Sequence, residues 1–300
     1  MITTLDQVVE HIKGQKQRRL AVACGEDPHT IAAVGRAVKE KLVSAVLTGD
    51  KSKIEAVARE NKVDPASFEI VDEPDTKNAL GLAVSRVKAG QSDFLMKGLV
   101  DSSLYIKAII DKEKGLLRPG KLLSHVSIIQ VPTRRKLIVC ADAAVIPYPD
   151  LEAKVQILEY CLAVSRRLGI EKPKAAIICA VEKVNPKMVP TTDAAILSKM
   201  AERGQIKNAI VDGPLALDVA VSAESAEIKG VRSPVAGEAD VLLFPNIETG
   251  NVFFKTCSYL AGGITAALVA GADCPCVLTS RSDSEDSKYY SIALGALTSC

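Results

Sequence analysis

The fold is decided by a short segment near the start of the chain, LAVACGEDPHT (residues 20–30). Its first five residues form a near-continuous apolar run, as strands covered on both faces do. A loop of small and acidic residues follows, and Asp27 before Pro28 is a typical helix start. The segment therefore predicts a strand, a loop and a helix in succession, which is the repeating unit of parallel α/β folds.

Apolar runs of the same kind recur along the chain and alternate with stretches of helical periodicity. The clearest helix spans 151–169, where apolar residues from Leu151 to Leu162 share one face and Gly169 provides a stop signal. Further strands are predicted at 44–49, 68–71, 93–98, 175–180, 209–213, 240–245 and 276–280.

One region departs from this alternation. Residues 124–142, SHVSIIQVPTRRKLIVCAD, favour two strands joined by a turn from Pro132 to Arg135, which is a hairpin. At roughly 150 residues per domain, the 300 residues of the chain correspond to about two domains. We therefore predict an α/β protein of two domains, with a boundary near Leu123 and the hairpin at the start of the second.

Composition excludes several classes of protein. With 48% hydrophobic and 25% charged residues, the chain is neither disordered nor collagen-like. Its net charge of +2 gives no bulk attraction to nucleic acid or to an anionic membrane. The aromatic content of 4%, without Trp, leaves few rings for stacking bases. We therefore expect no nucleic-acid or membrane partner, and any anion must be bound locally.

The location of the protein is also predicted by what the sequence lacks. The first 20 residues contain no apolar run of signal-peptide type, and no stretch reaches the ~18 apolar residues of a membrane span. The eight cysteines lie mostly within apolar runs, where Cys behaves as a small hydrophobe. We expect a soluble cytoplasmic protein with reduced, structural cysteines.

Four segments combine the end of an apolar strand, a loop of small and hydroxyl residues and a helix start: 24–30, 96–105, 233–251 and 279–288. In parallel α/β sheets the ligand crevice lies outside the carboxyl ends of the strands, and helix-start amides bind anions. These segments predict an anionic ligand. The alternative for any one loop is plain helix capping by residues such as Asp27, Ser102 or Ser103.

Two of these loops also carry a cation, Lys97 in one and Arg281 in the other. Arg281 follows Ser280 and precedes three carboxylates, so the segment offers a bidentate phosphate clamp, a hydroxyl donor and a carboxylate base. The carboxylates are Asp283, Glu285 and Asp286. The alternative is a solvated acidic first turn that pairs with Arg281, which the helix dipole favours by itself.

Other chemistries find little support. The sequence has neither a GxxxxGK[ST] loop nor a GxGxxG turn after a strand, and no GxSxG elbow. The three histidines are scattered without zinc-ligand spacing, so we predict no metal site.

Several longer segments are similar to the phosphate acetyltransferase/phosphate butyryltransferase family, and they occur in the family's order over nearly the whole chain. The segments at 212–221 and 279–294 resemble the butyryltransferase branch more than the acetyltransferase branch. The matching segments are MKGLVDSS (96–103), CADAAVIPYPDLEAK (140–154), DGPLALDVAV (212–221), SPVAGEADVLLFPNIETGNVFFK (233–255) and TSRSDSEDSKYYSIAL (279–294).

The resemblance implies an acyltransferase that exchanges an acyl group between acyl-CoA and phosphate, giving acyl phosphate and CoA by direct transfer, with no metal or organic cofactor. It implies two α/β domains of three-layer α/β/α type with mainly parallel sheets and an active-site cleft between them. The first domain would comprise 1–123 plus 268–300, and the second 124–267. It also implies a homodimer or a higher homo-oligomer.

The same resemblance assigns roles to residues. Arg281 would bind the phosphoryl group and Ser280 would hydrogen-bond the thioester. The base that deprotonates the CoA thiol would be Asp286 or Asp283, with Asp286 ranked slightly first. Substrate-binding roles are expected, from position, for Lys97, Ser102, Ser103, Ser233 and Asn251.

Three alternatives stay open. The acyl preference could be acetyl instead of butyryl, because a methylene gives only about 1–3 kcal/mol of discrimination. The chain could be a non-catalytic acyl-CoA or phosphate-binding protein, although it retains Ser280 and Arg281. A nicotinamide-dependent dehydrogenase has a similar layered architecture, and the missing glycine fingerprint weakens that alternative without excluding it.

Overall fold

The computed structural model describes residues 1–280 and 283–299. The chain divides into two compact units. The terminal unit comprises Leu5–Leu123 and Thr265–Cys300, and the central unit comprises Met1–Thr4 and Ser124–Ile264. Each unit is described below by itself.

The terminal unit is built on a sheet with the strand order β3-β2-β1-β4-β11-β10. Its neighbouring strands run parallel except for β11 and β10, which pair antiparallel. The strands are β1 (Arg18–Ala23), β2 (Val43–Gly49), β3 (Glu69–Asp72), β4 (Phe94–Lys97), β10 (Ile264–Ala270) and β11 (Cys276–Val277).

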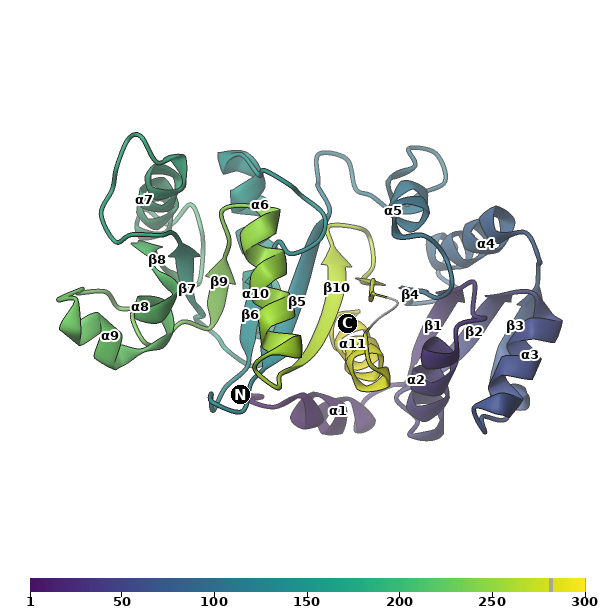
Figure 1. Cartoon of the computed structure of the whole chain (residues 1–300). Coiled ribbons are helices and arrows are strands. Elements are labelled where there is room, and N and C mark those ends of the chain that lie inside the picture. Colours follow the sequence, from purple (N-terminus) through teal and green to yellow (C-terminus); the bar gives the residue numbers. More distant parts are fainter. Residues whose placement is uncertain (281–282, 300) are drawn as a thin grey trace. The chain divides into compact units, whose positions relative to one another are not determined.

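The helices of the terminal unit cover both faces of this sheet (Figure 1). Helices α1 (Leu5–Lys13), α2 (Pro28–Lys39) and α11 (Glu285–Thr298) pack against one another. Helix α3 (Lys51–Glu60) follows α2 on the same face, and a short 3-10 turn, η1 (Pro65–Ser67), follows α3. The right-handed crossover from β3 to β4 places α4 (Thr76–Lys88) on the opposite face, where it contacts β1 and β2 and, beside it, α5 (Ser102–Ile110).

An aspartate begins each of the helices that follow the first four strands. The side chains of Asp27, Asp50, Asp75 and Asp101 accept backbone N–H groups of the first turns of α2, α3, α4 and α5. Such caps satisfy amides that have no partner within the helix. The same local interaction, an aspartate cap, therefore starts the helix in each of these four strand, loop and helix repeats.

The central unit has the strand order β5-β6-β9-β7-β8, and only β5 and β6 pair antiparallel. Its strands are β5 (Ser124–Gln130), β6 (Ile138–Ala141), β7 (Lys174–Ile178), β8 (Ile210–Leu215) and β9 (Val241–Leu243). Helix α6 (Leu151–Arg167) packs on β5, β6 and β9, and α7 (Val189–Glu202) packs on β7 and β8.

Alternate strand residues of the central unit form a second core with the remaining helices. In this core Cys140, Ala176 and Leu242 pack with Val219 and Phe254. The helices concerned are α8 (Leu217–Val221), α9 (Ala223–Ile228) and α10 (Ile247–Tyr259). Because successive strand residues point to opposite faces, the sheet is covered on both sides.

The observed architecture confirms the predicted fold class, which is three-layer α/β/α with mainly parallel sheets. Each strand predicted from an apolar run is present, the 124–142 hairpin is β5 and β6, and the 151–169 helix is α6. The sequence analysis did not predict β10. Within the described ranges, no helix is long and apolar enough to cross a membrane.

Candidate functional site

In the terminal unit, three strand ends lie side by side at the carboxyl edge of the sheet. Ala23 of β1 pairs in register with Lys97 of β4, and Met96 of β4 pairs with Val277 of β11. The loops that follow these strands form the candidate site, which we call the strand-end site. It consists of residues 24–27, 97–103 and 279–288 as far as these are described.

The first two loops of the strand-end site are in direct backbone contact. The N–H of Gly98 donates to the carbonyl oxygen of Ala23 at 2.9 Å, and the N–H of Leu99 donates to that of Cys24 at 2.6 Å. A Cβ atom on Gly98 would lie 2.1 Å from the Cys24 carbonyl oxygen. Only glycine fits here, because any side chain would separate the two loops.

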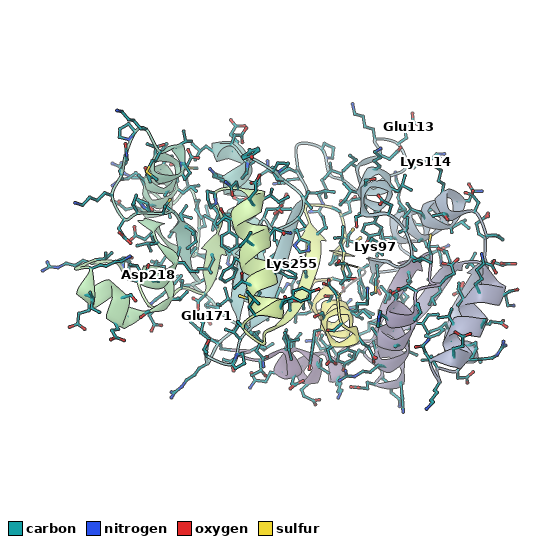
Figure 2. The ribbon with its side chains drawn as sticks, in the orientation of Figure 1. Lys97, Glu113, Lys114, Glu171, Asp218 and Lys255 are labelled. Atoms are coloured by element: carbon teal, nitrogen blue, oxygen red, sulfur yellow. The ribbon has the colours of Figure 1, made fainter. Side chains whose placement is uncertain are left out.

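Lys97 places a buried positive charge in this loop (Figure 2). Its side chain is 3% exposed, and Nζ donates to the carbonyl oxygens of Val100 at 3.1 Å and Gly98 at 3.3 Å. These carbonyls lie just ahead of α5, whose N-terminal amides carry partial positive charge. A fixed ammonium beside a helix N-terminus suits an anionic group.

Ser102 and Ser103 form the exposed start of α5. The helix is capped by Asp101, whose carboxylate accepts the N–H of Ser103 at 2.8 Å. Capping therefore does not explain the two serines, whereas Asp27 caps α2 as that alternative expected. Their hydroxyls stand in the first turn of the helix that follows Lys97.

The third loop carries the predicted catalytic pair. Ser280 is exposed, and its N–H donates to Oδ2 of Asp283 at 2.7 Å, so the carboxylate closes a turn around the serine. Arg281, the predicted phosphoryl-binding residue, lies outside the described residues. Ser284 caps α11 by accepting the N–H of Ser287 at 3.1 Å.

Lys288 is a functional candidate that the sequence analysis missed. It is 2% exposed, and its Nζ lies 3.1 Å from the carbonyl oxygen of Ser280, 3.3 Å from Oγ1 of Thr279 and 3.8 Å from Oδ2 of Asp27. Burial lowers the pKa of this lysine, while Asp27 and Asp283 oppose that shift. The sequence carries one signal for this residue. Lys288 lies four positions after Ser284, the cap of α11, and residues four apart lie on the same side of a helix.

Lys288 ties the loop after β11 to the start of α2. Asp27, its acidic neighbour, already caps α2 by accepting the N–H of Thr30 at 2.8 Å and the Thr30 hydroxyl at 2.5 Å. The two loops are thus held together by one ammonium and one carboxylate, both largely excluded from solvent.

The two carboxylates proposed as the base have different surroundings. Asp286 forms an ion pair with Arg36 of α2 at 2.8 Å, and the Arg36 guanidinium lies 3.8 Å from the centre of the Tyr289 ring. Asp286 therefore joins α11 to α2. Asp283 instead contacts the backbone of Ser280, so the structure brings Asp283 to the predicted serine and engages Asp286 elsewhere.

Cys24, a cysteine of this site, is unsuited to be a nucleophile. Burial raises the pKa of Cys24 to about 12, nearby Glu26 adds to the shift, and Lys97 opposes it. Its Sγ lies 3.6 Å from the carbonyl oxygen of Thr76. All seven cysteines described by the structure are free, and among the described residues no three His, Cys, Asp or Glu side chains are grouped as metal ligands.

In the central unit, Asn251 lies at the carboxyl edge of the sheet. Its Nδ2 donates to the carbonyl oxygen of Ala143 at 3.0 Å, in the loop after β6. The same loop is held by buried Asp142, whose carboxylate accepts the N–H groups of Ala144 at 2.7 Å and Val145 at 2.8 Å. Asn251 therefore positions this loop from α10.

Ser233 is not brought to that edge. Its Oγ accepts the N–H of Val235 at 3.1 Å, and the next residue, Pro234, lines a hollow together with Lys172 and Ala209. Lys172 and Ala209 precede β7 and β8, so this hollow is at the amino edge of the sheet. The structure thus places Ser233 and Asn251 at opposite edges of the sheet of the central unit, and their substrate-binding roles stay predictions.

Comparisons with known proteins agree with this architecture. The profile of the family described as phosphate acetyl/butaryl transferase matches residues 3–80 and 75–296. The chain is 44% identical to a phosphate butyryltransferase of Clostridium acetobutylicum, covering 99% of this chain and 98% of that protein. It is also 44% identical to a phosphate acetyltransferase of Thermotoga maritima, covering 98% and 99%.

A solved structure adds a likeness in three dimensions. The branched-chain phosphotransacylase of Enterococcus faecalis V583 superimposes with a TM-score of 0.83 at 29% identity, covering 94% of this chain and 99% of that one. The profile and these relatives span nearly the entire sequence. We conclude that the chain belongs to the phosphate acetyl/butaryl transferase family of acyltransferase enzymes.

Proposed function

We propose that the protein transfers an acyl group between acyl-CoA and inorganic phosphate, with butyryl-CoA and phosphate giving butyryl phosphate and CoA. The observation that carries this proposal is the grouping of two buried lysines, Lys97 and Lys288, at the sheet edge that also carries Ser280. Two buried ammonium groups at one edge suit a substrate whose reacting groups are anionic.

The phosphate would bind at the start of α5. Lys97 supplies fixed positive charge, the α5 amides supply N–H donors, and the hydroxyls of Ser102 and Ser103 add further donors. Arg281 would complete the site with a planar guanidinium that can make two bonds to one phosphoryl group. Held in this way, phosphate is oriented as the nucleophile and stabilised as the leaving group of the reverse reaction.

Ser280 would act on the acyl group. Its N–H is bound by Asp283 and its carbonyl by Lys288, so the backbone that carries the hydroxyl is held on both sides. The hydroxyl can donate to the thioester oxygen as negative charge develops there. Preorganised donors of this kind stabilise a tetrahedral intermediate without reorganisation at the moment of reaction.

In the proposed direct transfer, a phosphate oxygen attacks the thioester carbonyl carbon and the C–S bond then breaks. The CoA sulfur leaves as a thiolate and takes up the proton that the attacking phosphate loses. Because a thiol has a pKa of ~8.5, a carboxylic acid or carboxylate at the sulfur assists this proton transfer in both directions.

Asp283 is the better candidate for that proton transfer. The ion pair of Asp286 with Arg36 directs its carboxylate toward α2, whereas Asp283 contacts the backbone of Ser280. The proposal reverses the order of the two residues that was expected from the sequence. It requires no acyl-enzyme intermediate, no metal and no organic cofactor.

The preference for butyryl over acetyl groups is the finer part of the proposal. It is supported by the segments at 212–221 and 279–294, which resemble the butyryltransferase branch. The relatives do not separate the two, because a butyryltransferase and an acetyltransferase are equally identical to this chain. A homodimer and a cytoplasmic location belong to the same proposal, on family resemblance.

The test is to mix the purified protein with phosphate and acetyl-, butyryl- or isobutyryl-CoA, and to follow thiol release. We expect phosphate-dependent release that is fastest with butyryl-CoA, and initial-rate lines that intersect when both substrates are varied. No phosphate-dependent release with any thioester would exclude the activity. Parallel initial-rate lines would instead indicate an acyl-enzyme intermediate.

A further inference from the structure

Two cysteines lie side by side where the chain enters β11. Cys274 and Cys276 flank Pro275, and their sulfur atoms are 3.9 Å apart. Cys274 is partly exposed, whereas each of the other six cysteines that the structure describes is buried. An oxidant can reach an exposed thiol, and a second thiol in contact with it can then form a disulfide. This pair therefore differs from the cysteines of the core, which act as small hydrophobes.

The backbone fixes one of these cysteines and leaves the other at the end of a bend. Cys276 pairs with Val269 of β10 and with Leu95 of β4, so it is held between two strands. Cys274 lies in the bend that precedes β11. Residues two apart on an extended chain are about 6.6 Å apart, a bend brings them closer, and disulfides join Cα atoms separated by roughly 4.4–6.8 Å. A movement of Cys274 toward Cys276 can therefore close a disulfide.

The two thiols have different surroundings. The hydrogen bond to Cys274 and burial hold the pKa of the Cys276 thiol well above its ordinary value. Cys276 therefore stays protonated, and solvent reaches Cys274 first. Because the contact with Cys274 is the largest cause of the shift, oxidation of Cys274 removes that cause and allows Cys276 to react.

The pair is connected to the strand-end site through β11. This strand is only two residues long, and Cys276 lies four positions before Ser280. The carbonyl oxygen of Val277 accepts the hydroxyl of buried Tyr105 at 3.2 Å, which ties the strand to α5. A displacement at the start of β11 is therefore passed along a short segment to the loop that carries Ser280.

The bend before β11 is anchored to the segment that follows α5. The N–H of Asp273 donates to the carbonyl oxygen of Leu116 at 2.8 Å, and the Asp273 carboxylate pairs with Arg118 at 2.7 Å. Movement of Cys274 toward Cys276 pulls on these contacts, because Asp273 is its neighbour in the chain. Formation of a disulfide thus disturbs the bend on one side and β11 on the other.

We propose that Cys274 and Cys276 form a reversible thiol–disulfide site for hydroperoxide oxidants, and that the oxidised protein turns over its substrate more slowly. The second part rests on the proposed function. With hydrogen peroxide, the Cys274 sulfur attacks the O–O bond, a sulfenic acid forms and one water leaves. The Cys276 sulfur then attacks that sulfur, the S–S bond forms, the S–O bond breaks, and the leaving hydroxide takes the thiol proton as a second water. Two thiols are oxidised and one peroxide is reduced.

A disulfide at this place is suited to reversal. It joins residues two apart, so it closes too small a loop to stabilise the fold appreciably. Exposed disulfides are also the ones most readily reduced. Both points favour a transient response to oxidants over a structural cross-link.

The first experiment treats the full chain with hydrogen peroxide and maps its thiols. We expect two of the eight thiols to be lost and to return with dithiothreitol. Cleavage before aspartate gives residues 273–282, a peptide that contains these two cysteines and no other. The mass of this peptide should fall by two hydrogen atoms. If the peptide keeps both thiols, or gains oxygen without forming a disulfide, the thiol–disulfide site is overturned.

Variants assign the two roles. Cys274→Ser, at a partly exposed position, should keep its thermal melt and lose no pair of thiols. Cys276→Ala should stop the reaction at the Cys274 sulfenic acid, which dimedone traps. Cys179→Ser is the matched control, because its hydroxyl can donate to the Pro190 carbonyl oxygen that the thiol contacts at 3.3 Å. It should lose two thiols as the wild type does. Loss of two thiols from Cys274→Ser would show that other cysteines react.

The effect on turnover is measured on the same samples with butyryl-CoA and phosphate. Oxidation should lower the kcat of the wild type by about tenfold or more, because displacement of a site residue by about 1 Å can cost up to about 10²-fold. Dithiothreitol should restore it, and Cys274→Ser should keep its kcat throughout. If the disulfide forms and kcat is unchanged, the effect on turnover is overturned and the thiol–disulfide site stands. If untreated wild type turns over no thioester, the proposed function fails, and the peptide map still tests the thiol–disulfide site.

Discussion

Nζ of Lys288 lies 3.1 Å from the carbonyl oxygen of Ser280, a contact that joins the first turn of α11 to the loop after β11. The same Nζ reaches Thr279 at 3.3 Å and Asp27 at 3.8 Å. A buried ammonium that bonds to backbone oxygen and hydroxyl groups holds a loop in one conformation. Lys288 is therefore a positioning residue for Ser280, and its removal should affect turnover more than substrate binding.

Lys288→Met should lower kcat with butyryl-CoA by about 10- to 150-fold, which corresponds to the roughly 1.5–3 kcal/mol of hydrogen bonds to a charged group. The KM for phosphate should change by less than threefold. Because the carboxylate of Asp27 loses this buried partner, the thermal melt should fall, and the kinetics are measured well below it. Steady-state kinetics of Lys288→Met, with Lys16→Met as the control variant, test this prediction. An unchanged kcat would show that α11 positions Ser280 without the lysine.

The two candidate bases should respond differently to amide substitution. Asp283→Asn removes the carboxylate at Ser280 and should lower kcat by about 10²–10⁴-fold. Asp286→Asn breaks a partly exposed ion pair with Arg36, which typically contributes no more than about 1 kcal/mol, and should leave kcat within threefold. If the larger loss falls on Asp286→Asn, the carboxylate of Asp286 is the base.

The pKa of Cys24 gives a prediction about reactivity. With a pKa of about 12, the thiol remains protonated at pH 8 and should resist iodoacetamide. Cys24→Ser should keep kcat within threefold of the wild type. Because the folded pKa is raised, the stabilising effect of the protonated thiol is fully present below the ordinary pKa of 9.0 and is lost as the pH rises toward 12. Rapid alkylation at pH 8 with parallel loss of activity would contradict this.

Arg281 should not be replaceable by lysine. We expect Arg281→Lys to be nearly as damaging as Arg281→Ala, because a point charge cannot make the two parallel bonds of a guanidinium to one phosphoryl group. Losing that interaction should cost about 2–4 kcal/mol of transition-state stabilisation, or roughly 30- to 1000-fold in kcat/KM. Kinetics and a thermal melt of both variants test this. A kcat/KM above about a third of wild type in Arg281→Ala would mean that Arg281 only pairs with surface carboxylates.

Much of the fold could be predicted because strands covered on both faces have a one-dimensional signature, the continuous apolar run. Strand β10 was missed although its sequence is equally apolar. The strand lies between Gly263 and Gly271 and pairs antiparallel with β11, so it falls outside the alternation of strand and helix that guided the other assignments. Its apolar composition does not indicate which strand it pairs with.

The candidate site was predicted less completely, for reasons of distance along the chain. The segment 279–288 was identified, but the role of Asp286 depends on Arg36, which is 250 residues away, and appears only when α11 packs on α2. Lys288 was missed because its partners at Ser280 and Thr279 are a backbone carbonyl and a hydroxyl, which leave no charge pattern in the sequence. Ser233 and Asn251 were grouped by proximity in sequence, whereas β9 carries the chain from one sheet edge to the other between them.

The terminal unit is assembled from two segments that lie far apart in the sequence, and this has a consequence for its synthesis. Strands β10 and β11 and helix α11 leave the ribosome long after β4, yet β11 pairs with β4 and α11 buries ten consecutive residues, Lys288 to Leu297. At roughly 5–20 residues per second, β4 waits on the order of ten seconds or longer for its partner. During that interval the apolar residues Phe94 to Met96 have no neighbouring strand on one side, so this edge of the nascent sheet is open to pairing with other chains until β11 is synthesised.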